Sequence, residues 1–371
     1  MTNEFDQYRQ AKKRQGGRTD TRSPLVGWGL VLILLVLNTV SWFFAIQGYQ
    51  AMVNKPEATH GTTARPESSH RTSGVPVPPG RILAERDSNE LALAFLDVGQ
   101  GDAIFIQTPN NRNLLIDAGE GSNPDSKYSR AVEAARELII PFFKRNKVNK
   151  LDYFITSHPH SDHIGGAYRI IKKVSIDELW AAGKNHPSRS KKDMLKAIEQ
   201  KKHEYDLEFH VPGAVGGTLQ EGQKLDLGPS VRGWLLRTAP QAESVNESSL
   251  SILLYFGNVG MLFTGDTERK GEKELLRQWG NQLDVEILKS GHHGSRTSTI
   301  PPFARTVDPE HTVHMVGHYN SYGHPSKEVL SRLRRLGSKN YRTDRHGTVF
   351  MFTDGRTIDV KNRPVISAVN D

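Results

Sequence analysis

The chain has 371 residues, enough for one large domain or two ordinary ones, which excludes a small scaffold that depends on disulfides. Lysine and arginine number 49 against 41 aspartates and glutamates, so the formal charge is +8 and the surface should attract phosphates, anionic lipids or other polyanions. The absence of cysteine excludes disulfides and thiolate metal sites, and leaves any metal to histidine, aspartate, glutamate or asparagine.

The start of the chain predicts a membrane anchor. Residues 1–24 form a basic tail, and residues 25–46 are an uncharged apolar run, close to the roughly 20 residues with which an α-helix crosses a bilayer. The alternative is the hydrophobic part of a cleaved signal peptide, which is usually only about 7–15 residues long. Because positive charge before the run favours a cytoplasmic N-terminus, we expect a single-pass protein of the cell membrane whose remaining residues are extracytoplasmic.

Residues 47–88 predict a flexible linker. They are rich in Pro, Ser, Thr and Gly and contain few large apolar side chains, so they cannot bury enough surface to fold alone. We therefore expect one folded domain over residues 89–371.

Within that domain, short apolar runs bounded by turn residues predict strands. They cover residues 91–98, 103–108, 113–118, 151–157, 250–256, 260–265, 284–290, 311–317 and 348–353. Apolar residues that recur every three or four positions predict helices over residues 129–145, 190–203, 269–279 and 326–337. Strands with interspersed helices favour a layered α/β domain.

The strongest chemical signal is SHPHSDHIGG, residues 157–166, directly after the strand at 151–157. Four side chains that can bind a metal, His158, His160, Asp162 and His163, fall within six residues at a strand end. Histidines two apart can converge on one ion from a turn, while the next two groups can face a second ion or a water. The alternative is a solvated histidine-rich loop.

Two further strands deliver polar residues at their ends. MLFTGD ends on Asp266, whose carboxylate can bridge two cations or simply form a turn. DVEILKSGHHGS brings His292 and His293 into a glycine-flanked loop, where both histidines or only one can be ligands. Three such strand ends together indicate a binuclear metal site.

The motifs HPHSDH, TGDT and KSGHHGS, in this order, resemble the metal-binding motifs of the metallo-β-lactamase superfamily. FLDVGQGDAIFI, LLIDAG, NESSLSILL, NSYGHPS and YRTDRHGTV are similar, more narrowly, to the extracellular hydrolase domain of ComEC-type DNA-uptake proteins. The similarity covers about residues 91 to 352.

This resemblance implies a four-layer αββα sandwich with two divalent metal ions, zinc or manganese, at one edge. It implies that His158 and His160 hold the first metal, that Asp162 and His163 hold the second, and that Asp266 bridges them. His293, with His292 close behind it, is the expected further ligand of the second metal. In such sites a metal-bridging hydroxide attacks phosphorus or a carbonyl, and Asp162 helps to orient it.

Several roles stay open at this stage. Asp97, Gln100, Asp102 and Asp117 either support the site or form turns. His324, in the loop NSYGHPS, either protonates a leaving group or closes the pocket by hydrogen bonding. Family members often have one more histidine on the first metal, and the residues available for that position are His186, His203, His210 and Asn246.

Two basic runs would suit a nucleic-acid backbone beside such a site, although basic runs are usually solvated helix faces. They contain Lys184, Arg189, Lys191, Lys192, Lys196, Lys201 and Lys202, and then Arg332, Arg334, Arg335, Lys339, Arg342 and Arg345. The sequence thus predicts a metal-dependent phosphodiesterase that acts on nucleic acid. The alternatives are hydrolysis of another phosphoester, such as a phosphocholine or nucleotide, and a non-catalytic envelope binding module. β-Lactam hydrolysis ranks lower.

Overall fold

The computed structural model describes residue 83 and residues 86–121, 133–182, 186–201, 207–211, 222–239 and 242–362. The predicted basic tail, membrane helix and nearly all of the linker lie outside these residues. In the part of the chain that is described, no helix combines the length and the apolar character needed to span a bilayer.

The first sheet is mixed and runs in the order β15-β14-β1-β2-β3-β4-β5-β6. Its strands from β15 to β3 are antiparallel to their neighbours, whereas β3 to β6 are parallel. The strands are β1 (Leu91–Phe95), β2 (Ile104–Gln107), β3 (Asn113–Ile116), β4 (Lys150–Thr156), β5 (Ser175–Ala181), β6 (Glu208–His210), β14 (Val349–Thr353) and β15 (Ile358–Asn362).

The second sheet is also mixed, in the order β13-β12-β11-β10-β9-β8-β7. Here β10 to β13 are parallel and β7 to β10 are antiparallel. The strands are β7 (Gln223–Asp226), β8 (Val231–Arg237), β9 (Leu250–Phe256), β10 (Val259–Phe263), β11 (Ile287–Lys289), β12 (His311–His314) and β13 (Lys339–Arg342).

Alternation along the strands explains how the two sheets pack. In β1, Leu91, Leu93 and Phe95 belong to the core between the sheets, whereas Ala92 and Ala94 belong to the core beneath the helices of the first sheet. This follows because successive side chains of a strand point to opposite faces. The Phe95 ring lies 6.2 Å from that of Phe263 in the other sheet. Every residue of β1 is therefore buried, and the strand reads as a continuous apolar run.

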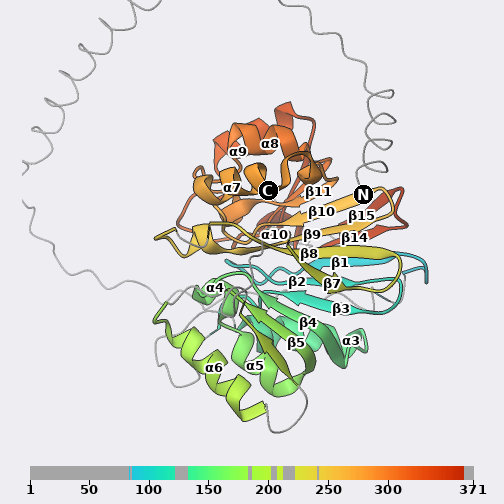
Figure 1. Cartoon of the computed structure of the whole chain (residues 1–371), viewed down its shortest axis with the longest axis vertical. Coiled ribbons are helices and arrows are strands. Elements are labelled where there is room, and N and C mark those ends of the chain that lie inside the picture. The colour runs from blue at the N-terminus through green and yellow to red at the C-terminus, as the bar shows by residue number, and fades with distance from the viewer. Residues whose placement is uncertain are drawn as a thin grey trace, which may run out of the picture. The chain divides into compact units, whose positions relative to one another are not determined.

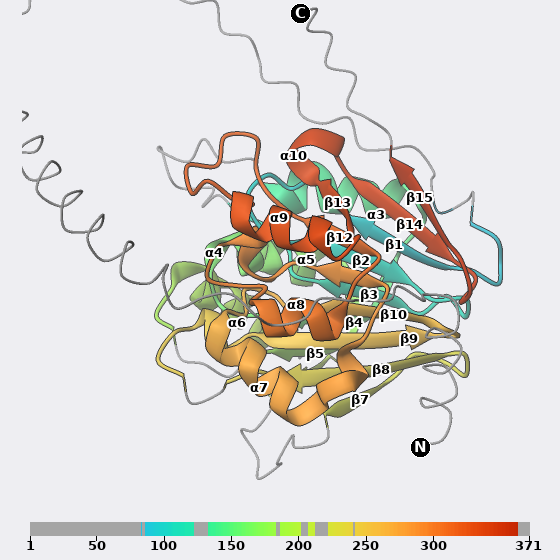
Figure 2. The ribbon, with the colours of Figure 1, turned by 90° about the horizontal axis from the view of Figure 1, so that it is seen from above.

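Helices cover the outer faces of both sheets (Figures 1 and 2). On the first sheet they are α3 (Ile140–Arg145, continuing a π-helical segment at Ala135–Ile139), α5 (Ala167–Lys173) and α6 (Arg189–Lys201). On the second they are α7 (Arg269–Trp279), α8 (Pro301–Val307) and α9 (Lys327–Arg335). Short helical turns occur at α4 (Ser161–Ile164), α10 (Thr343–His346), Asn246–Ser248, Gly280–Leu283 and Gly291–Gly294.

The predicted α/β architecture is confirmed, and it consists of two mixed sheets. All nine predicted strands are present. The sequence reasoning missed β5 to β8, β13 and β15. The strand β8, VRGWLLR, shows why: it contains a glycine and two arginines, which weaken the alternation typical of strands.

Candidate metal centre

The predicted metal-binding side chains meet where parallel strands of the two sheets end. The loops after β4, β10 and β11 carry them in three groups: His158, His160, Asp162 and His163; then Asp266; then His292 and His293. The hydrogen bond from the Leu250 N–H to the Ser157 carbonyl, 2.8 Å, joins the two sheets at this edge.

Asp266 is at the centre of the cluster, with a side chain that is only 3% exposed. Its Oδ1 lies 3.2 Å from His163 Nε2, and its Oδ2 lies 3.5 Å from His293 Nε2. The same Oδ2 lies 3.8 Å from His158 Nε2 and 3.8 Å from His292 Nε2. A carboxylate that faces histidines from several loops is suited to bridge two cations.

At one end of the cluster, two histidine side chains are suited to bind a metal in their uncharged form. His158 Nε2 and His160 Nδ1 lie 3.0 Å apart, so their lone pairs can converge on one ion. Burial, together with neighbouring His163, lowers the pKa of His158 well below its ordinary value. Neutral imidazoles are the form that ligates a metal, so this pair fits the first cation.

The other end concentrates negative charge. Asp162 Oδ2 lies 3.3 Å from His293 Nε2 and 3.8 Å from His163 Nε2. Burial by itself lowers the pKa of His163, but the carboxylates of Asp266, Asp162 and Asp117 outweigh it and hold that pKa well above its ordinary value. Without a metal, protons on these histidines therefore balance the carboxylates, which marks the place where a second cation is favoured.

Unbonded buried atoms show that these residues fit metal ions. Among the described residues, His163 Nε2 and Asp266 Oδ1 make no hydrogen bond although both are buried. Such atoms are costly unless a ligand satisfies them. Their 3.2 Å separation and their nitrogen and oxygen chemistry suit a divalent cation.

Asp117, predicted as a support or a turn former, lies directly behind the ligands. Its Oδ1 accepts the Ser157 N–H at 2.7 Å, and its Oδ2 accepts the Ser157 hydroxyl at 2.6 Å and lies 2.8 Å from His163 Nδ1. With Nδ1 held in this way, Nε2 of His163 faces Asp266. A carboxylate behind a histidine fixes its tautomer and orientation.

Replacing Asp117 with asparagine should therefore lower the affinity for a divalent metal about 10–100-fold. The substitution turns one acceptor oxygen into an NH₂ group, which must then face either the Ser157 N–H or the Ser157 hydroxyl and His163 Nδ1. Metal titration of the full-length chain, followed by calorimetry, measures this. Asp97→Asn is the matched control, because Asp97 does not line the metal pocket and its Oδ1 lies 3.5 Å from the Gly99 N–H. Equal affinities in both variants would contradict the orienting role.

Asp102 and Lys289 form a buried ion pair that the sequence analysis did not anticipate. The Lys289 side chain is fully buried; its ammonium donates to Asp102 and, at 3.0 Å, to the Gly265 carbonyl, and it lies 3.7 Å from Asp266 Oδ1. The sequence feature that could have indicated this pair is Lys289 itself, a lysine at the end of an otherwise apolar strand. The ammonium thus places a positive charge close to the Asp266 carboxylate.

Asp102 also belongs to a cluster, with His163, Asp266 and His293, whose ligand atoms lie within 4.8 Å of one another. Its oxygens, however, lie 3.4 Å from Nδ1 of His293 and 3.8 Å from Nδ1 of His163. The Nε2 atoms of those rings face Asp162 and Asp266. We therefore assign Asp102 to the support behind the site and Asp162 to the metal side.

A glycine brings Asp102 close to the metal loop. A side chain at Gly101, where φ is +126°, would meet the Asp162 carbonyl oxygen at 2.1 Å. The Asp102 N–H bonds to that same carbonyl at 3.2 Å. The motif GQGD thus allows the turn after β1 to pack directly on the ligand loop.

His292 and His293 have left-handed backbone conformations, with φ of 45° and 55°. Such conformations are unfavourable outside glycine and are often found at functional sites. His292 Nδ1 lies 2.9 Å from Glu268 Oε1, and His293 Nδ1 lies 2.9 Å from the Met315 carbonyl. Both rings are therefore held so that Nε2 is directed toward Asp266.

A hollow of about 370 Å³ opens over the cluster. It is lined by Gln100, His160, Ser161, Asp162, His186, Ser188, Asn246, Asp266, His292, His293, Tyr322 and His324. Asn246 has a buried Oδ1 without a hydrogen bond among the described residues, and the His186 ring lies 5.2 Å from that of His160. Two of the four open choices for the extra first-metal ligand, His186 and Asn246, therefore reach the pocket.

The other open residues are placed differently. His210 stacks on Trp180, with ring centroids 4.3 Å apart, and does not line the pocket. His203 lies outside the described residues. Gln100 lines the pocket and accepts the Gly317 N–H at 3.2 Å.

His324 lines the pocket from the loop after β12. Burial, followed by the nearby His292 and His293, lowers the pKa of His324 to about 4, so its ring is neutral near pH 7. Its buried Nδ1 has no hydrogen-bond partner in the described part of the chain. This arrangement favours hydrogen bonding in the pocket over donation of a proton.

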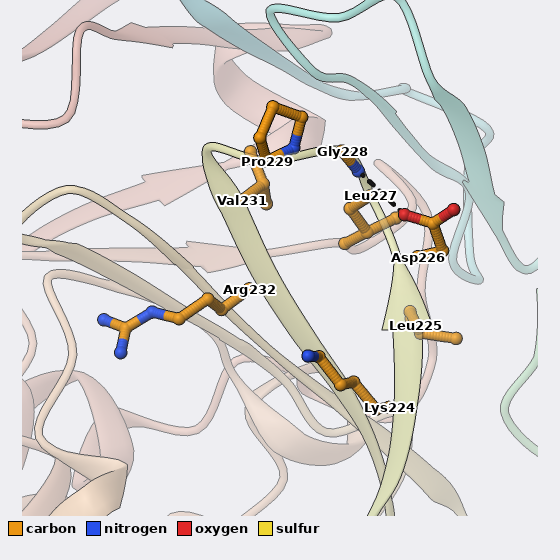
Figure 3. Close-up of a pocket in the computed structure, with 8 residues that line it drawn as sticks. All are labelled: Lys224, Leu225, Asp226, Leu227, Gly228, Pro229, Val231 and Arg232. Carbon is orange, nitrogen blue, oxygen red and sulfur yellow. Dashed lines mark hydrogen bonds between the residues drawn. The ribbon is translucent and has the colours of Figure 1, made fainter. Parts of the chain in front are cut away.

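A second hollow, of about 440 Å³, lies at the hairpin of β7 and β8 (Figure 3). It is lined by Lys224, Leu225, Asp226, Leu227, Gly228, Pro229, Val231 and Arg232. No histidine and one carboxylate are among these described residues, and that carboxylate already accepts the Gly228 N–H at 3.2 Å. The hollow therefore lacks the donors of a metal site.

Two sheets that hold a buried histidine and aspartate cluster between their strand ends define a metal-dependent hydrolase. The chain belongs to the metallo-β-lactamase superfamily: the model of that family matches residues 96–318.

Two sequence relatives indicate to which part of the superfamily the chain is similar. The chain is 30% identical over 267 residues to ComE operon protein 3 of Bacillus subtilis (strain 168), covering 71% of this chain and 33% of the relative. It is 29% identical over 261 residues to competence protein ComA of Neisseria gonorrhoeae, covering 70% of this chain and 32% of the relative. The chain thus spans about a third of the length of these relatives, and its likeness to ComEC-type proteins is confirmed.

A solved structure with a similar fold is the metallo-beta-lactamase fold protein YhfI from Bacillus subtilis, with a TM-score of 0.42 and 11% identity over 73% of this chain and 100% of that one.

Proposed function

We propose that the chain is a metal-dependent phosphodiesterase that cleaves nucleic acid. The observation that carries this proposal is the buried histidine and aspartate cluster around Asp266, which opens to a polar pocket beside a basic helix. Divalent cations held there would activate a water molecule and stabilise charge on a phosphoryl oxygen. Zinc and manganese both suit histidine and aspartate donors.

The chain's own residues supply position and charge. Asp162 has a side chain that is 26% exposed and faces the pocket, so it can hold the attacking water by hydrogen bonding. The unbonded Nδ1 of His324 can orient the phosphate if it carries the ring proton, whereas the unbonded Oδ1 of Asn246 can bind a cation or accept a hydrogen bond from the attacking water. Asp117 and Asp102 keep His163 and His293 in place.

Nucleic acid is favoured as the substrate by charge around the pocket. Ser188 lines the pocket, and α6 begins at the next residue with exposed Arg189, Lys192 and Lys196. Cations along a helix that starts at the pocket can follow a phosphate backbone. The relation to proteins named for competence is consistent with this substrate.

We also propose that residues 25–46 anchor the chain in the cell membrane and that the hydrolase domain lies outside the cytoplasm. The support is the long uncharged run, which follows a basic segment in the sequence.

Cleavage of labelled single- and double-stranded DNA by the full-length chain with manganese or zinc tests the proposal. We expect cutting that is lost in a His160→Ala, Asp162→Ala variant and kept in His210→Ala, whose histidine lies outside the pocket. A metal-loaded wild-type chain that leaves both DNAs intact would falsify nuclease activity. Release of product from phosphocholine or nucleotide esters would then favour another phosphoesterase. Turnover of nitrocefin would favour a β-lactamase, and the absence of any turnover would favour a binding module.

A further inference from the structure

The loop between β12 and α9 exposes two tyrosines beside the metal centre. Among the described residues, the large apolar side chains that are exposed are Leu195 at 41%, Tyr319 at 88% and Tyr322 at 70%. Two of these three therefore lie on one loop, and Tyr322 also lines the metal pocket. Aromatic rings left in water at the rim of a site indicate a binding surface.

Tyr322 extends a series of rings that begins at a metal ligand. The Tyr322 ring lies 5.8 Å from that of His324 at an interplanar angle of 24°, and the His324 ring lies 6.5 Å from that of His293 at 28°. Each neighbouring pair of rings is thus tilted by 28° or less. One face of Tyr322 is backed by His324, and its exposure leaves the other open to a planar group.

The loop is held in place before any ligand arrives. The Asn320 amide donates to the carbonyls of Gly317 at 3.0 Å and His324 at 3.1 Å, and its Oδ1 accepts the His324 N–H at 3.0 Å. Gln100 fixes the start of the loop through the Gly317 N–H. Because the ring is already positioned, stacking on it costs little ordering entropy.

We propose that Tyr322, backed by His324, stacks on an unpaired nucleobase next to the phosphodiester in the metal pocket, with Tyr319 as a further exposed ring on the same loop. This inference rests on the proposed nuclease function and specifies its substrate as single-stranded nucleic acid. A duplex keeps its bases stacked inside, whereas a single strand presents a free π-face for each base. Cations that follow the phosphates, combined with an aromatic ring for the base, are the usual means of binding single strands.

The test compares Tyr322→Ala with Tyr322→Phe in the full-length chain. We expect Tyr322→Ala to raise KM for a single-stranded oligonucleotide about tenfold with kcat much less affected, and Tyr322→Phe to match the wild type. An abasic strand with the same phosphates is the matched probe, and its KM should not change in either variant. Quenching of 2-aminopurine fluorescence on binding should be present in the wild type and Tyr322→Phe and lost in Tyr322→Ala.

Each outcome decides between the two proposals. If single strands are cut but Tyr322→Ala behaves as the wild type, the platform is overturned and the nuclease stands. If Tyr322→Ala raises KM for the abasic strand as much as for the intact strand, the tyrosine supports the loop and does not stack on bases. If the wild type hydrolyses bis(p-nitrophenyl) phosphate but neither binds nor cuts nucleic acid, the nuclease proposal fails and the platform fails with it.

Discussion

Replacing Asp266 with asparagine should lower the rate of phosphodiester hydrolysis at least about a thousandfold. The substituted amide keeps the size of the side chain and one oxygen but loses the charge that faces His163, His293 and His158 within 3.2–3.8 Å. Metal-ion catalysis contributes several kcal/mol, and each ~1.4 kcal/mol is a tenfold change in rate. If Asp266 bridges two cations as proposed, its loss should affect both of them together.

The measurement is the rate on bis(p-nitrophenyl) phosphate beside elemental analysis of bound metal in the full-length chain. We expect the variant to retain less metal than the wild type. Asp226→Asn is the matched control, since that side chain is 78% exposed at the end of β7, and it should change neither quantity. Full metal content with an unchanged rate in Asp266→Asn would show that the carboxylate does not bridge.

Replacing Lys289 with methionine should destabilise the fold by about 3–5 kcal/mol, the usual cost of removing one partner of a buried ion pair. Methionine fills a similar volume but removes the ammonium partner of the Asp102 carboxylate, and both side chains are almost fully buried in the wild type. Burial alone would favour the neutral form of both groups. Their pairing outweighs burial, so the pKa of Lys289 lies above its ordinary value and the pKa of Asp102 lies below its ordinary value.

Urea unfolding of the full-length chain measures this loss. The double variant Lys289→Met, Asp102→Asn should recover much of it, because replacing both members of a buried pair is often nearly neutral. Lys339→Met, at a position 61% exposed on β13, serves as the control and should change stability little. If Lys289→Met unfolds at the wild-type urea concentration, the pair is not needed for stability.

Much of the fold and of the ligand set can be read from the sequence, because the signals are local. Apolar runs bounded by turn residues predict the strands, and HPHSDH, GD and GHHG each follow a run directly. A strand end fixes where the following side chains emerge, so residue type and position are enough to nominate His158, Asp266 and His293. The strands that were missed carry weak local patterns, as in β8.

Only the tertiary structure decides which atoms of these side chains meet. The pairing of Asp102 with Lys289 joins the turn between β1 and β2 of the first sheet to the end of β11 in the second. The arrival of Asn246 and His186 at one pocket depends on how β9 and α6 pack. The same holds for Tyr322, whose exposure and stacking on His324 follow from the folded loop. Except within the Tyr322 loop, these contacts arise from packing between distant segments, and no periodicity or spacing along the chain encodes them.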